Sequence, residues 1–280
     1  MLGDQGEGNA SQRLVSGVLD RVCEERGCDL VLFTGDNLYP RGMSGPDDPE
    51  MDRVFTKIYG GLDLPMYAVL GNHDYAHGRN EQRAKWQVAW ARRSPDMIMP
   101  HRHYTFSAGD AADFFALDTT WIFWNGGEPQ ESWLRQELDA SDARWRVVFG
   151  HHPIRSNGKH GNAGTYEGLP AVPYVSGLGL ARFFDASVCG RADLYLSGHE
   201  HNRQWMSHCG VELIVSGAGA KAKPLLDRGN RPRFASEAIG LVWVELASDQ
   251  MRVAFYDQDG QLEYEGARRR PPPTPVRQDI

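Results

Sequence analysis

Short apolar runs recur along the chain, and they predict a buried β-sheet. Each run is only a few residues long, is rich in Val, Ile, Leu, Phe or Tyr, and does not alternate with polar residues. Such runs are typical of strands that are covered on both faces of a sheet. We predict six of these strands, over residues 29–33, 66–70, 114–117, 146–149, 194–197 and 213–216.

Amphipathic helices are predicted between several of the strands. The apolar face of the first helix would consist of Leu14, Val15, Val18, Leu19 and Val22. The second helix would begin with Asp48 as its N-cap and Pro49 at its first helical position. Its apolar face would consist of Met51, Val54, Phe55 and Ile58. Because strands and helices alternate, we expect an α/β fold with helices on both sides of the sheet.

The length and composition predict one globular domain followed by a short tail. Of the 280 residues, 41% are hydrophobic and 24% are charged, as in ordinary globular proteins. We see no linker or repeat, so residues 1–267 are predicted as one domain and residues 268–280 as an Arg/Pro-rich, disordered tail. No apolar run approaches the ~20 residues of a membrane helix. The net charge of −7 argues against a nucleic-acid partner.

The beginning of the chain raises a question that the sequence leaves open. Asp4 stands so early that a signal peptide has no room and a strand hardly any. Either a leader was removed or the start site is misassigned.

If Gly27 ends the first predicted helix in a left-handed conformation, the side chains of Cys23 and Cys28 meet. They would form either an apolar contact between thiols or a disulfide.

The other two cysteines, Cys189 and Cys209, present the same alternatives. No cysteine spacing matches a zinc knuckle or a redox motif. Disulfides persist in oxidising compartments. Two disulfides would therefore imply that the native protein is periplasmic or secreted.

Polar clusters follow four of the predicted strands, and a fifth cluster stands near the amino terminus. They are Asp4–Gln5–Gly6, Gly35–Asp36–Asn37–Leu38–Tyr39, Gly71–Asn72–His73–Asp74, Gly150–His151–His152 and Gly198–His199–Glu200–His201. Ligands of open α/β sheets bind beyond the carboxyl ends of the strands, so we expect these clusters to converge. Carboxylates, imidazoles and an amide oxygen suit iron, manganese or zinc. Each cluster alone could be an ordinary turn, but five in this order predict a metal site.

These residues resemble a known family. Asp4-x-Gly6, Gly35-Asp36-x-x-Tyr39, Gly71-Asn72-His73-Asp74, Val148-x-x-His151 and Gly198-His199-x-His201 look like the calcineurin-like metallophosphoesterases, and more narrowly the purple acid phosphatases of the small tartrate-resistant type. The related serine/threonine phosphatases carry histidine where this chain has Gly6. The resemblance runs from Gly3 to about Gly266 and includes a closing strand pair around residues 241–244 and 253–256. It implies an α/β fold, a four-layer α/β/β/α sandwich of two mixed β-sheets, with a dimetal centre at its edge.

The resemblance also implies a ligand set for two metal ions. A ferric ion would be held by Asp4, Asp36, Tyr39 and His201. A divalent ion, Fe(II), Zn(II) or Mn(II), would be held by Asp36, Asn72, His151 and His199. Asp36 would bridge the two ions, and a phenolate from Tyr39 would give the protein its colour. A tyrosine that merely packs in the core is the alternative for Tyr39.

The implied reaction is hydrolysis of phosphate monoesters by attack of a metal-bound hydroxide. His73 would help to protonate the leaving group, Asp74 would orient the His73 ring, and His160 would face the substrate unless it is a surface histidine. We assign no role to His152. Structural or solvated roles are expected for His77, His101, His103, His208, Lys221 and Lys223.

Several functions compete on this evidence. The leading one is an acid phosphatase, acting as a monomer on small phosphate esters and releasing inorganic phosphate. A phosphodiesterase or nucleotide pyrophosphatase on the same metals is the alternative. A protein that only binds metal and phosphate is disfavoured, because it needs no leaving-group acid such as His73. Gln5 stands where the family commonly has tryptophan. The loop at 119–130 is too short to hold the protease-sensitive restraint of the animal enzymes. The long loop at 155–179 is expected to shape substrate access.

Overall fold

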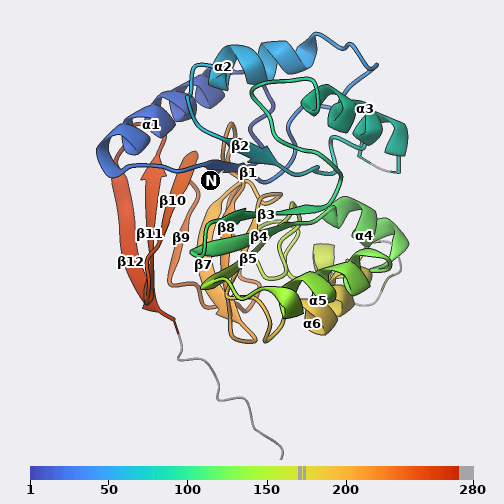
Figure 1. The fold of residues 1–280 in the computed structure, drawn as a ribbon, viewed down its shortest axis with the longest axis vertical. Helices are drawn as coiled ribbons and strands as arrows, with labels where there is room; N and C mark the ends of the chain where they lie inside the picture. The colour runs from blue at the N-terminus through green and yellow to red at the C-terminus, as the bar shows by residue number, and fades with distance from the viewer. Residues whose placement is uncertain (78, 170–171, 173–174, 271–280) are drawn as a thin grey trace, which may run out of the picture.

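The computed structural model describes residues 1–77, 79–169, 172 and 175–270, and its largest element is a sheet of seven strands (Figure 1). The strand order is β3-β4-β5-β6-β8-β7-β9, and the central strands β4, β5, β6 and β8 are parallel. The outer strands pair antiparallel, so the sheet is mixed. The strands are β3 (Tyr104–Ala108), β4 (Ala112–Ala116), β5 (Trp145–Phe149), β6 (Leu194–Ser197), β7 (Arg203–His208), β8 (Val211–Ser216) and β9 (Phe234–Ser236).

A second mixed sheet is assembled from two smaller ones by the first residues of the chain. β1 (Val31–Phe33) and β2 (Met66–Ala68) pair in parallel, and β10 (Gly240–Leu246), β11 (Gln250–Asp257) and β12 (Leu262–Arg269) pair antiparallel. Met1 exchanges two backbone hydrogen bonds with Val242 of β10, at 2.6 and 3.1 Å. The Leu2 N–H donates to the Leu32 carbonyl of β1 at 3.0 Å. The amino-terminal segment therefore lies between β10 and β1 and joins them.

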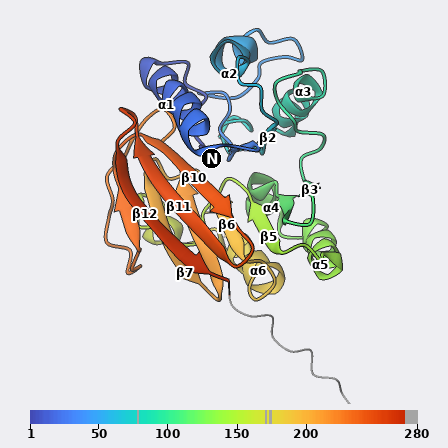
Figure 2. The same ribbon diagram turned by 60° about the vertical axis from the view of Figure 1, so that its left-hand side comes forward.

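Helices cover the outer face of each sheet. On one side lie α1 (Ala10–Arg26), a π-helix (Asp52–Thr56), α2 (Lys57–Tyr59) and α3 (Glu81–Ala91); on the other lie α4 (Thr119–Asn125), α5 (Gln130–Ala140) and α6 (Leu178–Ser187) (Figures 1 and 2). β5 shows how the layers are separated: Val147 and Phe149 belong to the core between the sheets, and Val148 belongs to the core beneath α4–α6. The predicted four-layer α/β/β/α sandwich is confirmed.

The six predicted strands all form, and the closing pair is β10 and β11. Two helix predictions need correction. Leu14 is 51% exposed, because the buried stripe of α1 is narrower than predicted and runs through Val15, Val18 and Val22. The second helix is largely a π-helix, although the Asp48 carboxylate caps its start by accepting from the Glu50 N–H at 3.0 Å. Apolar spacing over so short a segment does not distinguish an α-turn from a π-turn.

The predicted tail begins too early. β12 extends to Arg269, and the Arg268 and Arg270 side chains contact Glu212 at 3.1 Å and Asp193 at 3.4 Å. These carboxylates are distant in sequence, so a basic run next to prolines gave no sign of them. Residues 271–280 of the predicted tail lie outside the described residues.

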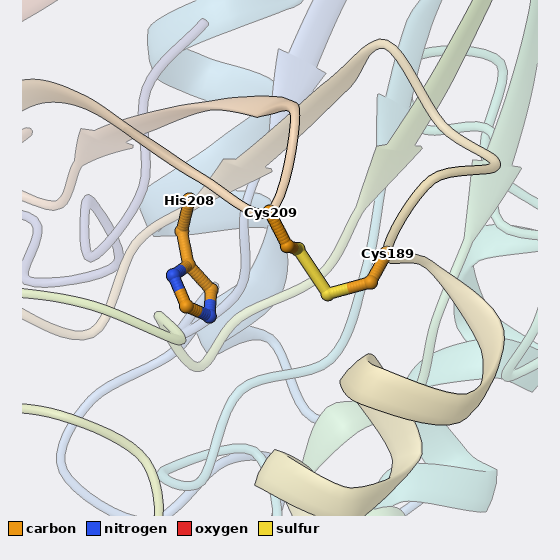
Figure 3. A group of neighbouring side chains, drawn as sticks. All are labelled: Cys189, His208 and Cys209. Carbon is orange, nitrogen blue, oxygen red and sulfur yellow. A yellow bond between two sulfur atoms is a disulfide. The ribbon is translucent and has the colours of Figure 1, made fainter.

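All four cysteines form disulfides, Cys23–Cys28 and Cys189–Cys209. The first closes the end of α1, where Gly27 has a φ of 80° and donates to the Cys23 carbonyl. The second ties the end of α6 to the turn between β7 and β8, beside His208 (Figure 3). Because both sulfurs near His208 are bonded to each other, this group is not a metal site in the oxidised protein. Among the described helices, none combines the length and apolar character needed to cross a membrane.

Candidate metal centre

The five predicted clusters converge at one edge of the sandwich, where the strands end. The ligand atoms of Asp4, Asp36 and His151 all lie within 4.8 Å of one another. Asp4, Asp36 and His199 have φ values of 58°, 55° and 67°, a left-handed backbone that is unusual for residues other than glycine. This turn at the end of each segment aims the side chain into the centre. Gly71 allows the close approach, since a Cβ there would lie 2.1 Å from Asp36 Oδ1.

One half of the centre consists of carboxylates around a phenol. The Tyr39 hydroxyl lies 2.8 Å from Asp36 Oδ2 and 3.1 Å from Asp4 Oδ1, and its single proton serves both carboxylates. His201 Nε2 lies 3.4 Å from both the Tyr39 oxygen and Asp4 Oδ1. His201 Nδ1 is buried without a hydrogen-bond partner. We call Asp4, Tyr39 and His201 the phenol half of the centre.

The other half consists of imidazoles around an amide oxygen. His151 Nε2 and His199 Nδ1 each lie 3.0 Å from Asn72 Oδ1 and 3.2 Å from each other. His151 Nδ1 lies 2.9 Å from the Thr34 carbonyl, which can only accept, so this nitrogen carries the proton. His151 Nε2 therefore turns a lone pair toward other acceptors. We call Asn72, His151 and His199 the imidazole half.

The donor atoms of both halves fit cations. Burial, followed by the charge of Asp36, raises the pKa of Asp4 to about 7, even though His151 opposes this shift. Burial and the two carboxylates raise the pKa of Tyr39 well above its usual value. Burial lowers the pKa of His199 well below normal. Buried anions and converging lone pairs are stabilised by bound cations, and this mixed oxygen and nitrogen set suits iron, zinc or manganese.

His73 lies beside the centre with a fixed ring. Its Nε2 is 3.8 Å from Asp36 Oδ2, and its Nδ1 is 2.7 Å from the Pro40 carbonyl, to which it donates. The backbone N–H of His73 donates to Asp36 Oδ1 at 2.8 Å. The rings of Tyr39 and His77 pack against it, with centroids 4.2 and 3.7 Å away. The ring therefore presents Nε2 toward the carboxylates, and burial lowers the pKa of His73 to about 4.

The prediction that Asp74 orients the His73 ring is wrong. The buried Asp74 carboxylate accepts from the backbone N–H groups of Gly71, Asn37 and Leu38, at 2.8, 3.1 and 3.2 Å. These bonds use the carboxylate to tie two ligand-bearing loops together, while the Pro40 carbonyl takes the role expected for Asp74. Burial raises the pKa of Asp74 to about 8.

His160 lies beside the imidazole half, and its role in facing the substrate stays a prediction. Its ring centroid is 4.4 Å from that of His199, and its Nδ1 is paired with the Glu167 carboxylate. The buried Glu200 carboxylate, which we did not single out, accepts from the backbone N–H groups of His160 and Gly161 at 2.8 and 2.9 Å. Glu200 therefore ties the His160 loop to the turn that carries His199 and His201. A Cβ at residue 158 would lie 2.2 Å from its Oε2, so glycine is required there.

The sequence comparisons identify the family to which this geometry belongs. A family model described as calcineurin-like phosphoesterase matches residues 7–203. Purple acid phosphatase 4 of Arabidopsis thaliana is 31% identical over 288 residues, which cover 93% of this chain and 80% of that protein. The chain is a purple acid phosphatase of the calcineurin-like phosphoesterase family. Tartrate-resistant acid phosphatase type 5 of Rattus norvegicus is 25% identical, with coverage of 90% and 83%.

Solved structures agree on the fold. The GAP50 anchor in the inner membrane complex of Plasmodium matches with a TM-score of 0.76 at 21% identity, covering 95% of this chain and 86% of that one. The purple acid phosphatase PPD1 of yellow lupin, Lupinus luteus, matches with a TM-score of 0.69 at 15% identity, covering 95% of this chain and 52% of that one. At these identities the similarity concerns the fold alone.

The site of this purple acid phosphatase contains two side chains for which we expected structural or solvated roles. The exposed His77 packs on His73, and the Lys221 Nζ lies 3.3 Å from the centre of the Tyr39 ring while pairing with Glu7. Both reach the site from loops whose path the motifs do not reveal. His152 stacks on Phe123 with centroids 5.4 Å apart.

The remaining residues singled out in the sequence surround the purple acid phosphatase site or lie away from it. Gln5 is buried and donates to Asn37 at 3.0 Å. His103 packs on Trp133, His101 contacts Arg92, and His208 contacts Arg155 at 3.3 Å. The Lys223 side chain is exposed, as expected, although its backbone N–H donates to the His201 carbonyl.

Proposed function

We propose that this purple acid phosphatase hydrolyses phosphate monoesters at a dinuclear metal centre. The observation that carries the proposal is the position of Asp36 between the two halves. Its Oδ2 lies 2.8 Å from the Tyr39 hydroxyl and its Oδ1 lies 3.5 Å from His151 Nε2. One carboxylate can therefore contact an ion in each half, which is what a two-metal site requires.

The residues of each half would hold one ion. Asp4, Asp36, Tyr39 and His201 would hold Fe(III), because a phenolate and carboxylates favour a hard trivalent ion. Asp36, Asn72, His151 and His199 would hold Fe(II), Zn(II) or Mn(II). The bound ions would activate water as the nucleophile and neutralise the phosphoryl charge.

Side chains around the centre would serve the phosphate ester. His73 presents Nε2 while its Nδ1 donates to Pro40, so the protonated ring would give its Nε2 proton to the leaving oxygen. His160 stands beside His199, where it would contact a phosphate oxygen. The substrates would be small phosphate esters, and the product inorganic phosphate. The two disulfides support a periplasmic or secreted location for the protein, which we expect to be a monomer.

The proposal is tested by elemental analysis, a visible spectrum and paired assays on the purified protein. We expect two metal ions per chain, a charge-transfer band, and faster hydrolysis of mono- than of bis-nitrophenyl phosphate. Faster hydrolysis of the diester would instead support a phosphodiesterase or nucleotide pyrophosphatase. Bound metal without turnover of either ester would contradict the enzymatic proposal.

A further inference from the structure

A positively charged side chain lies over the face of the Tyr39 ring. The Lys221 Nζ is 3.3 Å from the centre of this ring, well inside the roughly 6 Å within which a cation is attracted to an aromatic face. The hydroxyl at the end of the same ring lies 2.8 Å from Asp36 and 3.1 Å from Asp4. Tyr39 therefore contacts candidate metal ligands through its oxygen and a cation through its face.

The backbone on either side of Lys221 is tied to the loops that form the phenol half. Gly219 donates its N–H to the carbonyl of Gly3, the residue before a candidate ligand, at 3.1 Å. Lys223 donates its N–H to the carbonyl of His201, itself a candidate ligand, at 2.7 Å. The loops that carry two candidate ligands of the phenol half therefore also set the place of Lys221.

The side chain of Lys221 is restrained as well as its backbone. Its ammonium pairs with the carboxylate of Glu7, which belongs to the same amino-terminal loop as Asp4. Both side chains are only 29% exposed, so solvent and salt screen this pair less than one on the surface. An unrestrained lysine would turn its ammonium toward water, as the exposed Lys223 is free to do. Lys221 is instead held over the ring.

A cation in this position acts on the electrons that Tyr39 would donate to a metal ion. The face of an aromatic ring is negative and attracts the ammonium. In the phenolate form that the proposed function assigns to Tyr39, negative charge spreads from the oxygen into the ring and strengthens this attraction. The Lys221 charge lies over the centre of the ring, whereas an ion would bind at the oxygen. It therefore stabilises the donor electrons of the ring more than the acceptor orbitals of the ion.

We propose that Lys221 is a positioning residue for the phenol half, which holds a charge over Tyr39 and weakens the donation of its phenolate to a ferric ion. The inference rests on the proposed function, because it requires iron in the phenol half. Weaker donation raises the energy of the charge transfer from phenolate to iron, and it makes the iron easier to reduce. It also leaves the bound ion a stronger Lewis acid for the activation of water.

The experiment compares the wild type with Lys221→Met, both loaded with iron in the phenol half and Zn(II) in the imidazole half. Methionine keeps the length of the side chain and removes its charge, and zinc ensures that the measured potential belongs to a single ion. We expect the maximum of the charge-transfer band to move to longer wavelength by on the order of 10 nm. We expect the Fe(III)/Fe(II) midpoint potential to fall. A merely structural contact between side chain and ring would change neither.

Two matched variants test whether the position of the charge matters. Lys223→Met removes the same charge from the same segment, two residues away, and should shift the band much less. Lys221→Arg keeps a cation that stacks on aromatic faces, and it should restore the maximum of the wild type. Iron content and melting curves establish that each variant is folded and loaded.

Three results would contradict these expectations in different ways. An unchanged maximum in fully loaded Lys221→Met would overturn the proposal. Equal shifts in Lys221→Met and Lys223→Met would also overturn it, because they would report the net charge of the protein rather than the contact with the ring. An iron-loaded wild type without a charge-transfer band would contradict the ligand role of Tyr39 in the proposed function, and this inference with it.

Discussion

The two halves of the metal centre differ in what holds them together. In the phenol half, the Tyr39 hydroxyl supplies a proton that both neighbouring carboxylates can share. In the imidazole half, His151 Nε2 turns a lone pair toward Asn72 Oδ1 and Asp36 Oδ1, which are also acceptors. The phenol half therefore joins both carboxylates through one proton without metal, whereas in the imidazole half only a proton on His199 Nδ1 can be donated to Asn72 Oδ1 or His151 Nε2. Asp36 belongs to both.

The largest effect is expected when Asp36, the connection between the halves, loses its charge. A neutral amide in Asp36→Asn bridges two mutually repelling cations poorly, so both ions should be lost. We expect metal affinity to fall by more than about 100-fold and activity to stay absent in excess metal. Metal stoichiometry and turnover should be measured together.

His199→Ala is the matched comparison, because His199 belongs to the imidazole half alone. Excess divalent ion should restore part of the activity in this variant, and iron should remain bound in the phenol half. If Asp36→Asn retains two metals and near-normal turnover, the bridging arrangement is wrong.

Substituting His73 tests protonation of the leaving group without removing a candidate metal ligand from either half. His73→Ala should lower kcat for alkyl phosphates by roughly 10²–10⁴-fold. Aryl esters should be affected far less, because a nitrophenolate leaves without needing a proton. Equal losses on alkyl and aryl substrates would assign His73 to binding or metal positioning.

Removing the metal should make the stability of the phenol half depend on pH. The pKa of Asp4 rises from 3.8 to about 7 on folding, so the metal-free native state binds more protons than the unfolded state between these values. The Asp4 contribution to stability should therefore fall as pH rises through this window, by roughly 1.4 kcal/mol per unit of pKa difference. The buried histidines His73 and His199, whose pKa values are lowered from 6.5, contribute the opposite slope below that value. Melting curves of the metal-free wild type and of a variant without the Asp4 carboxylate, at pH 5 and pH 7.5, isolate this contribution.

The control for this pH effect is the Asp4→Asn variant. It should lose the fall in stability that Asp4 contributes between pH 5 and pH 7.5, while the contribution of Asp74, whose pKa rises to about 8, remains. The same pH dependence of stability in the metal-free wild type and in metal-free Asp4→Asn would contradict the electrostatic description of the phenol half.

The smallest effect on the fold is expected from Tyr39→Phe. The ring stays packed against His73, so the melting temperature should change little, while the charge-transfer band should disappear. Visible spectroscopy and a melting curve on the iron-loaded variant test both statements. A colourless wild-type protein with full iron occupancy would show that Tyr39 does not bind the ferric ion.

The convergence of the candidate ligands could be predicted because four of the five clusters follow a buried strand, so one local pattern indicates both their place in the fold and their chemistry. Residues that act through distant partners could not be found in this way. Asp74 binds the loop after β1, Glu200 binds the loop that carries His160, and Lys221 packs on Tyr39. The same limitation explains Arg268, whose partner Glu212 lies on another strand. The spacing of these residues along the chain does not indicate these contacts.

At Asp4, Asp36 and His199 the backbone is left-handed, a conformation that the side chains proposed to bind metal disfavour. Side chains other than glycine strain the chain in this region, commonly by about 1 kcal/mol or more per residue. Glycine would relieve the strain while deleting a ligand. Glycine at these positions would therefore be expected to stabilise the same fold while weakening its binding of metal. Under the proposed function, metal binding rather than the stability of the fold accounts for these three residues.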